Sequence, residues 1–177
     1  MQGAVFLDRD GVLNQCKIIN GLPHPPRNLT ELKILPGVEV GLLILKRLGL
    51  KTIVVTNQPD VARGLFTIEQ VNEFNNFLQR KLPLDFFYVC PHDNADNCRC
   101  RKPKAGLIFT AAQEQKIDLS ASYLIGDRWR DVAAGQAADC KCYFIDYKYP
   151  EKSPSLPFTR VSSLLEAARR IEKEIKQ

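Results

Sequence analysis

Apolar runs of strand-like composition alternate along this chain with segments that have the spacing of amphipathic helices. This alternation restricts the possible folds more than any other feature. The clearest run is KTIVVTNQ, residues 51–58, whose continuous β-branched stretch is typical of a strand buried on both faces. Further strands are predicted over residues 4–8, 85–90, 122–127 and 142–146. Helices are predicted from residue 37, after residue 67, over 104–116, over 129–138 and near the C-terminus. This order predicts an α/β protein with a Rossmann-like, doubly wound parallel sheet.

Two of the helices and two irregular segments carry more specific expectations. The sequence TIEQ, which starts at Thr67, is a capping box. In the helix that it opens, the side chains expected to face the core are those of Val71, Phe74 and Leu78. The last helix is expected to place on one face Leu164, Ala168, Ile171 and Ile175. The proline-rich stretch 15–36 is expected to form a loop or flap, and residues 151–157 a linker.

The composition is that of an ordinary soluble globular chain, and it limits the partners to be considered. The 177 residues suit a single domain spanning 1–177, and 45% hydrophobic with 25% charged residues is typical. The formal net charge of +5 comes from scattered residues, which favours a solvated surface over a nucleic-acid-binding stripe. The apolar run near the N-terminus is too short for a signal peptide, and no stretch reaches membrane-spanning length. We therefore expect a cytoplasmic monomer that binds a small anionic molecule and has no nucleic-acid or membrane partner.

Polar side chains stand where three of the predicted buried strands end. Asp8 and Asp10 follow the first strand, Thr56 and Asn57 follow the second, and Asp127 follows the fourth. The carboxyl ends of parallel strands lie on one rim of the sheet, which is where ligands of such folds bind. These side chains are therefore expected to converge on one site. Taken alone, Asp8 and Asp10 are also compatible with a strand-end turn or a helix cap.

Carboxylates on one rim repel one another unless a cation neutralises them, and Mg²⁺ prefers oxygen ligands of this kind. With Mg²⁺ bound, a phosphate can approach Asp8, which can attack phosphorus and form an aspartyl-phosphate that water later cleaves. Asp10 can protonate the leaving oxygen and then deprotonate that water. Thr56 and a lysine can hold the phosphoryl oxygens while charge builds on them.

A second constellation lies in the segment CPHDNADNCRC, which contains Cys90, His92, Cys98 and Cys100. Three thiolates and one imidazole suit a tetrahedral, structural Zn²⁺ with no open position. The residues between them are too polar for a core element, so a metal would hold the zinc loop 90–100 and direct the cations that follow it. Unrelated buried thiols are the alternative interpretation. Outside this set, Cys16 is unassigned, and Cys140 and Cys142 are expected to be small buried residues rather than a redox pair.

Four segments resemble, in order and spacing, the sequence motifs of the haloacid dehalogenase superfamily of phosphatases: DRDGVLN, VVTNQ, RKPKAG and LIGDRWRD. The resemblance implies that Asp8 is the nucleophile and Asp10 the general acid and base. It implies that Thr56 and Lys102 stabilise the phosphoryl group. It also implies that Mg²⁺ is bound by Asp8, the backbone carbonyl of Asp10 and Asp127, in a fold without a large cap domain.

The zinc loop before CRKP is similar to that of one branch of this superfamily, which includes phosphatases of heptose bisphosphate and of histidinol phosphate. The segment TNQPDVARG resembles the heptose enzymes, whereas the five-residue spacer between His92 and Cys98 is closer to the histidinol-phosphate enzymes. The expected reaction is hydrolysis of the 7-phosphate of D-glycero-D-manno-heptose 1,7-bisphosphate, and the alternative substrate is histidinol phosphate. The expected substrate-binding residues are Asn57, Gln58, Arg101 and Arg128. A strand-end turn is an alternative role for Asn57.

Two further classes of function fit part of the sequence. An inactive, zinc-stapled binding module would account for the cysteines, but it leaves the full set of catalytic residue types unexplained. A nucleic-acid 3′-phosphatase would share the motifs but would need a basic groove that the sequence does not supply. Three residues stay undecided. His24 suits a solvated flap better than a substrate contact, Trp129 suits rim packing or a contact, and Asp131 suits a surface charge, an outer metal ligand or a direct contact.

Overall fold

The computed structural model describes residues 2–177, and one six-stranded parallel sheet forms its centre. The strands lie in the order β5 (Phe86–Cys90), β4 (Lys51–Asn57), β1 (Ala4–Leu7), β6 (Tyr123–Gly126), β7 (Lys141–Ile145) and β8 (Thr159–Val161). Each neighbouring pair runs parallel. The predicted Rossmann-like α/β fold is confirmed, and each of the five predicted strands forms within one or two residues of its expected bounds.

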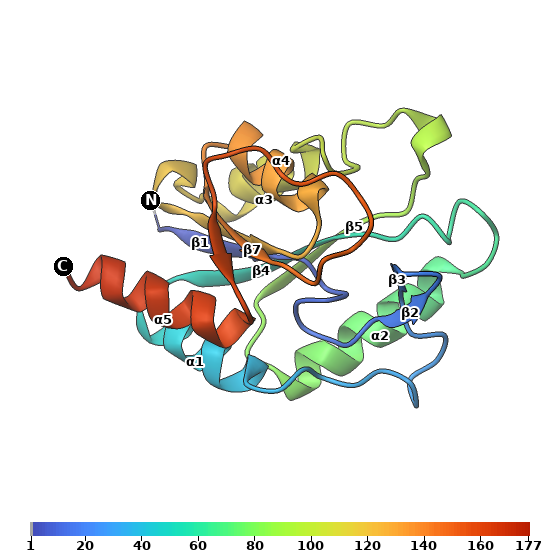
Figure 1. Ribbon diagram of the computed structural model, residues 1–177, viewed down its shortest axis with the longest axis horizontal. Coiled ribbons are helices and arrows are strands. Elements are labelled where there is room, and N and C mark those ends of the chain that lie inside the picture. The colour runs from blue at the N-terminus through green and yellow to red at the C-terminus, as the bar shows by residue number, and fades with distance from the viewer. Residues whose placement is uncertain (1) are drawn as a thin grey trace.

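Helices cover both faces of the sheet, so the molecule has three layers (Figure 1). On one side lie α1 (Val38–Arg47), α2 (Ile68–Lys81) and α5 (Leu164–Ile175), and on the other α3 (Gly106–Gln115) and α4 (Trp129–Ala137). Each side has its own apolar core, and β1 contributes alternate residues to both: Val5 and Leu7 to one, Ala4 and Phe6 to the other. This explains why the central strands have no polar face.

All five predicted helices form. The Thr67 side chain accepts a hydrogen bond from the backbone of Gln70 and completes the capping box of α2, and the three inward residues of that helix are buried. In α5, Leu164, Ala168 and Ile171 are buried, whereas Ile175 is 45% exposed. Ile175 is the last residue of α5, whose C-terminal turn extends beyond the sheet in Figure 1.

Two short pieces of β structure were not predicted. The flap contains an antiparallel hairpin of β2 (Lys17–Ile19) and β3 (Leu22–His24), joined by Asn20 and Gly21 with φ of 52° and 77°. An Asn-Gly pair with both φ positive is the favoured two-residue hairpin turn, so the signal was present in the sequence. The three-residue β8 follows the predicted linker and pairs in parallel with β7.

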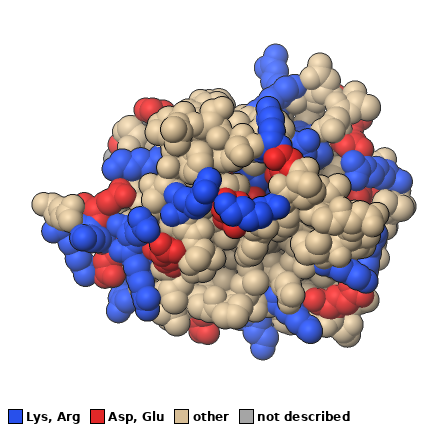
Figure 2. All heavy atoms as spheres, viewed as in Figure 1, with Lys and Arg blue, Asp and Glu red and all other residues tan. Residues whose placement is uncertain are grey.

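Charged groups are dispersed over the surface that Figure 2 displays, with acidic side chains between the basic ones. Among residues 2–177, no helix combines the length and apolar character that crossing a bilayer requires.

Candidate active site

A cavity of about 310 Å³ lies at the carboxyl ends of β1, β4 and β6, where the strand order reverses. Its size is at the lower end of small-ligand sites, which span about 300–1,000 Å³. All the residues predicted for catalysis, Mg²⁺ or substrate line it: Asp8, Asp10, Thr56, Asn57, Gln58, Arg101, Lys102, Asp127 and Arg128. Cys16, His24 and Asp131 also line it. Apolar lining comes from Leu22, Pro23 and Pro25 of the flap and from Pro59 after β4.

Asp8 extends β1 by one residue, since its backbone N–H donates to the carbonyl of Ile125 in β6. This hydrogen bond fixes the carboxylate at the rim, where the Asp8 side chain is only about one-eighth exposed. Burial raises the pKa of Asp8 to about 6, and the opposing attraction of Lys102, whose Nζ is 2.9 Å away, only partly offsets this. A further positive charge beside Asp8 would therefore stabilise its ionised form.

Lys102 is buried and holds two carboxylates together. Its Nζ donates to the Val55 carbonyl at 2.8 Å and lies 2.6 Å from Asp131 Oδ1, in addition to the contact with Asp8. Burial disfavours the charged ammonium, but Asp131 and Asp8 outweigh it and raise the pKa of Lys102. The side-chain amide of Asn57 exchanges two 3.1 Å hydrogen bonds with the backbone of Lys102. Asn57 therefore positions this lysine at the cavity wall.

Asp10 is held by three donors. The side chains of Arg9, Asn14 and Gln58 donate to its carboxylate at 2.9, 2.9 and 2.8 Å. Burial acts to raise the pKa of Asp10, but Arg9 and the hydrogen bonds outweigh it and lower the pKa. Gln58 also donates to Thr56 Oγ1 at 3.0 Å, and so ties Asp10 to the end of β4.

Arg9 does not line the cavity; it is completely buried and links Asp10 to α2. It donates to Asn75 Oδ1 at 3.2 Å and lies 5.7 Å from the centre of the Phe74 ring. The sequence interpretation missed both Arg9 and Asn75. Because 66 residues separate them, only the folded chain places them side by side.

The environment of Asp127 is the strongest indication of a cation-binding site in the cavity. Both of its oxygens are buried, and neither has a hydrogen-bond partner among the described residues. Burial, followed by the charges of Asp8 and Asp131, raises the pKa of Asp127 well above its usual range. Carboxylate oxygens of these three residues lie within 4.8 Å of one another. A hard divalent cation would satisfy the unpaired oxygens, so the residues present fit Mg²⁺.

Gly11 makes this approach possible. Its φ is +89°, and a Cβ at this position would lie 2.1 Å from Asp127 Oδ2. Any side chain here would therefore displace Asp127 from the rim. The glycine that follows Asp10 thus lets the turn after β1 lie directly against Asp127 at the end of β6.

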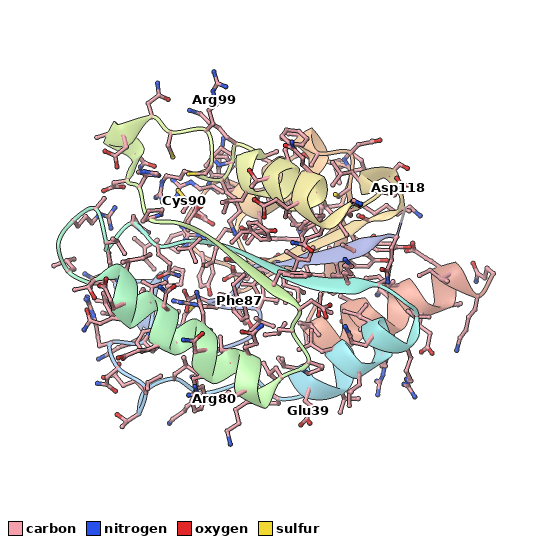
Figure 3. The ribbon with its side chains drawn as sticks, turned by 180° about the vertical axis from the view of Figure 1, so that it is seen from behind. Glu39, Arg80, Phe87, Cys90, Arg99 and Asp118 are labelled. Atoms are coloured by element: carbon pink, nitrogen blue, oxygen red, sulfur yellow. The ribbon has the colours of Figure 1, made fainter. Side chains whose placement is uncertain are left out.

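The cysteine cluster has the dimensions of a tetrahedral metal site. Its sulfur atoms are 3.2–3.7 Å apart, and the His92 Nδ1 is 3.3 Å from the Cys100 sulfur and 3.7 Å from that of Cys90. A metal–sulfur distance of about 2.3 Å puts sulfurs roughly 3.8 Å apart on a tetrahedron. Hydrogen bonds from Cys100 and Arg101 outweigh burial and lower the pKa of Cys98 to about 7, which favours a thiolate. Figure 3 shows Cys90 turned inward at the end of β5, while Arg99 points away from the molecule.

The two predicted substrate arginines have partners within the protein. Arg101 donates to Asn94 at 2.9 Å and to the His92 carbonyl at 3.2 Å, which fastens it to the cysteine loop. Arg128 forms a bidentate pair with Glu151, a residue the sequence interpretation missed. Both arginines line the cavity, but their guanidinium groups are not fully free for a ligand.

The residues that the sequence left undecided now have locations. Asp131 is buried, pairs with Lys102 and accepts a hydrogen bond from the Arg128 backbone at 2.9 Å, so a surface charge is excluded for it. Trp129 lies on the rim outside the cavity lining, with Lys152 Nζ 3.6 Å from its ring centre. Cys140 and Cys142 are buried free cysteines in the core, as expected.

A nucleophile-capable carboxylate beside a second carboxylate, a buried lysine and a cation site at the switch point of a parallel sheet is the arrangement of a metal-assisted phosphoester hydrolase. Comparison with known proteins specifies the family. Residues 26–139 match the model of the haloacid dehalogenase-like hydrolases, and the chain belongs to this family.

Several relatives share one name. The chain is 36% identical to the D-glycero-beta-D-manno-heptose-1,7-bisphosphate 7-phosphatase of Haemophilus influenzae, over 80% of this chain and 79% of that protein. It is 36% identical to the enzyme of that name from Helicobacter pylori strain 26695, over 85% and 87%. The crystal structure of D,D-heptose 1,7-bisphosphate phosphatase from B. bronchiseptica, complexed with magnesium and phosphate, is similar with a TM-score of 0.86 and 27% identity, covering 98% of this chain and 99% of that one.

Proposed function

We propose that this protein is a Mg²⁺-dependent phosphatase that hydrolyses the 7-phosphate of D-glycero-D-manno-heptose 1,7-bisphosphate through an aspartyl-phosphate. The observation that carries the proposal is the pairing of Asp8 with Lys102 beside the buried carboxylate of Asp127, whose oxygens accept no hydrogen bond from residues 2–177. This arrangement combines a nucleophile with carboxylate oxygens that fit a divalent cation. The heptose specificity is supported by the relatives, which cover most of this chain.

In the first step, an oxygen of Asp8 forms a bond to phosphorus, and the bond from phosphorus to the sugar oxygen breaks. Asp10 gives its proton to that leaving oxygen. In the second step, Asp10 takes a proton from water, whose oxygen attacks phosphorus and releases phosphate and free Asp8. Bound Mg²⁺ would be held by Asp8, Asp127 and the backbone carbonyl of Asp10, and it would supply positive charge for the phosphoryl oxygens.

Thr56 and Lys102 are assigned to the phosphoryl oxygens in both steps. The Lys102 ammonium already lies 2.9 Å from Asp8, so it is placed beside any group bonded to that carboxylate. Asp131 and the Val55 carbonyl hold the ammonium from behind, which keeps it charged and oriented as the phosphoryl group arrives. Gln58 acts through Asp10 and Thr56 rather than on the substrate.

A structural Zn²⁺ on Cys90, His92, Cys98 and Cys100 completes the proposal. Its role is supported by Arg101, whose guanidinium group is bonded to two residues of the same loop. Fixing the loop fixes the arginine at the cavity wall. The site needs cysteines as thiolates, which suits a reducing compartment such as the cytoplasm.

The test is an assay of phosphate release with Mg²⁺ on three substrates: heptose 1,7-bisphosphate, histidinol phosphate and an oligonucleotide with a 3′-phosphate. We expect kcat/KM for the bisphosphate to exceed that for histidinol phosphate by at least about tenfold, which is roughly 1.4 kcal/mol. Higher kcat/KM for histidinol phosphate, which the His92–Cys98 spacer favours, would replace the heptose assignment. Hydrolysis of none of the three, or equal activity of Asp8→Asn, would refute the phosphatase mechanism.

A further inference from the structure

The loop that joins β7 to β8, residues 146–158, borders the candidate cation site from outside the active-site cavity (orange to red in Figure 1). It lines a second cavity of about 230 Å³, whose wall includes Tyr147, Tyr149 and Glu151. Within the described range 2–177, Asp127 is the residue that lines both cavities. The loop therefore reaches the proposed Mg²⁺ ligands from a side that the substrate does not occupy.

Contacts at two points fasten this loop to the rim of the sheet. Glu151 accepts the bidentate pair of hydrogen bonds from Arg128. The hydroxyl group of Tyr147 donates at 3.0 Å to the backbone carbonyl of Gly11, which lies 136 positions earlier in the chain. The ring of Tyr149 stands between these points, with its centre 5.6 Å from that of the Tyr147 ring and 5.8 Å from Cζ of Arg128. The loop thus connects the first turn of α4 to the turn after β1.

The Gly11 carbonyl belongs to the turn that carries the backbone carbonyl of Asp10. The peptide bond between Asp10 and Gly11 is trans, so its C=O and N–H groups point in opposite directions. The Gly11 N–H donates to the Asn14 carbonyl at 2.8 Å, which directs the Asp10 carbonyl away from Asn14. The Tyr147 hydroxyl holds the next peptide group. Both peptide groups that flank Gly11 are therefore fixed by hydrogen bonds, one of them from the distant loop.

This turn needs support because it lies directly against a buried charge. A Cβ on Gly11 would be 2.1 Å from Asp127 Oδ2, so the turn and the carboxylate have no space between them. The charges of Asp8 and Asp127 repel each other until a cation neutralises them, and this repulsion favours a turn displaced from Asp127. The Kd of a ligand rises in inverse proportion to the fraction of molecules that have the binding arrangement. A bond that opposes the displacement therefore favours binding of the cation.

We infer that Tyr147 is a positioning residue for the metal: its hydroxyl group holds the turn after β1 in the arrangement that binds Mg²⁺, and so increases the affinity for the metal without touching the substrate. This inference rests on the proposed function, which requires Mg²⁺ as a cofactor. The hydroxyl acts through the Gly11 carbonyl and is not itself a ligand. Because Tyr147 is 42% exposed, removal of the hydroxyl alone disturbs little buried packing.

The experiment compares Tyr147→Phe with the wild type by calorimetric titration of MgCl₂ into the zinc-loaded, substrate-free protein. The net contribution of one neutral hydrogen bond corresponds to about two- to tenfold in an equilibrium constant. We expect the Kd for Mg²⁺ to rise by about threefold or more in Tyr147→Phe. In assays with heptose 1,7-bisphosphate, the Mg²⁺ concentration for half-maximal activity should rise by the same factor. At saturating Mg²⁺, KM for the sugar and kcat should stay within about twofold of the wild type.

Tyr88→Phe is the matched control, because the Tyr88 hydroxyl also donates one hydrogen bond, to Glu114 at 2.7 Å, and both residues lie outside the two cavity linings. This variant should retain the wild-type Kd for Mg²⁺. An unchanged Kd in Tyr147→Phe would overturn the inference, and so would an equal rise in KM at saturating Mg²⁺, which indicates a general loosening of the site. If the wild type binds Mg²⁺ but hydrolyses none of the three substrates, the proposed function fails, while the two Kd values still decide the role of Tyr147.

Discussion

Replacing Asp8 by Asn should abolish activity and yet stabilise the Mg²⁺-free protein. The substitution keeps the shape of the side chain, removes the attacking charge and closes the covalent route. We expect kcat to fall by at least about 10³-fold. The same change removes one of three like charges whose oxygens lie within 4.8 Å of one another. These charges repel one another in the buried site of the folded protein. Unfolding separates them, so the repulsion lowers the free energy of unfolding.

The size of the effect follows from the pKa of Asp8, which burial raises from the ordinary 3.8 to about 6. An acid with a raised folded-state pKa destabilises the fold above that pKa, and the destabilisation disappears as the pH falls below 3.8. This rise in the pKa of Asp8 corresponds to roughly 3 kcal/mol at pH 7.5. Asn also weakens the contact with Lys102, so the expected gain in the free energy of unfolding is about 1–3 kcal/mol.

Urea denaturation at pH 7.5 and at pH 4, with zinc retained and no Mg²⁺ added, measures this gain. Asp8→Asn should be more stable than the wild type at pH 7.5, and the difference should shrink at pH 4. The exposed Asp139 provides a matched control, since Asp139→Asn removes a surface charge and should change stability by less than about 0.5 kcal/mol. An Asp8→Asn protein less stable than the wild type at pH 7.5 would refute the argument from charge repulsion.

Three other perturbations test separate parts of the site. Asp10→Asn should lower kcat by at least about 10²-fold in steady-state assays, because both proton transfers use this group. Gln58→Ala removes one hydrogen bond that keeps the pKa of Asp10 low, so the alkaline limb of the kcat/KM profile should move to higher pH; an unmoved limb would contradict the assignment of Asp10 as the acid. Cys98→Ser should reduce bound zinc from about one per chain and lower the thermal midpoint of unfolding. The control Cys140→Ser, which lies outside the cluster, should retain zinc. Elemental analysis that finds no zinc in the reduced wild type would exclude the metal site.

The sequence predicted the sheet and its rim because both follow from local patterns. A buried strand such as 51–57 must be apolar on both faces, so polar side chains directly after it stand out. The order of strands along the chain then places Asp8, Thr56 and Asp127 on one edge without any knowledge of distances. The cysteine cluster was predictable for a similar reason, because its four residues lie within eleven positions of the sequence.

The supporting contacts were not predictable in the same way. Arg9 meets Asn75, and Arg128 meets Glu151, through packing of segments that are distant in the chain. No local pattern distinguishes Glu151 from any other surface acid of a linker. The hairpin turn at Asn20 is different, because its Asn-Gly signal was present and was not used.

The arrangement of charges also explains how this site couples its metal to its fold. Without a cation, burial and the repulsion between Asp8 and Asp127 raise the pKa values of both acids, which opposes folding at neutral pH. A cation that binds only the folded chain reverses this, and a concentration one hundred times its Kd adds about 2.7 kcal/mol to the free energy of unfolding. Mg²⁺ should therefore raise the urea midpoint of the wild type more than that of Asp8→Asn, which has lost one ligand charge. Equal shifts in the two proteins would place the cation away from Asp8.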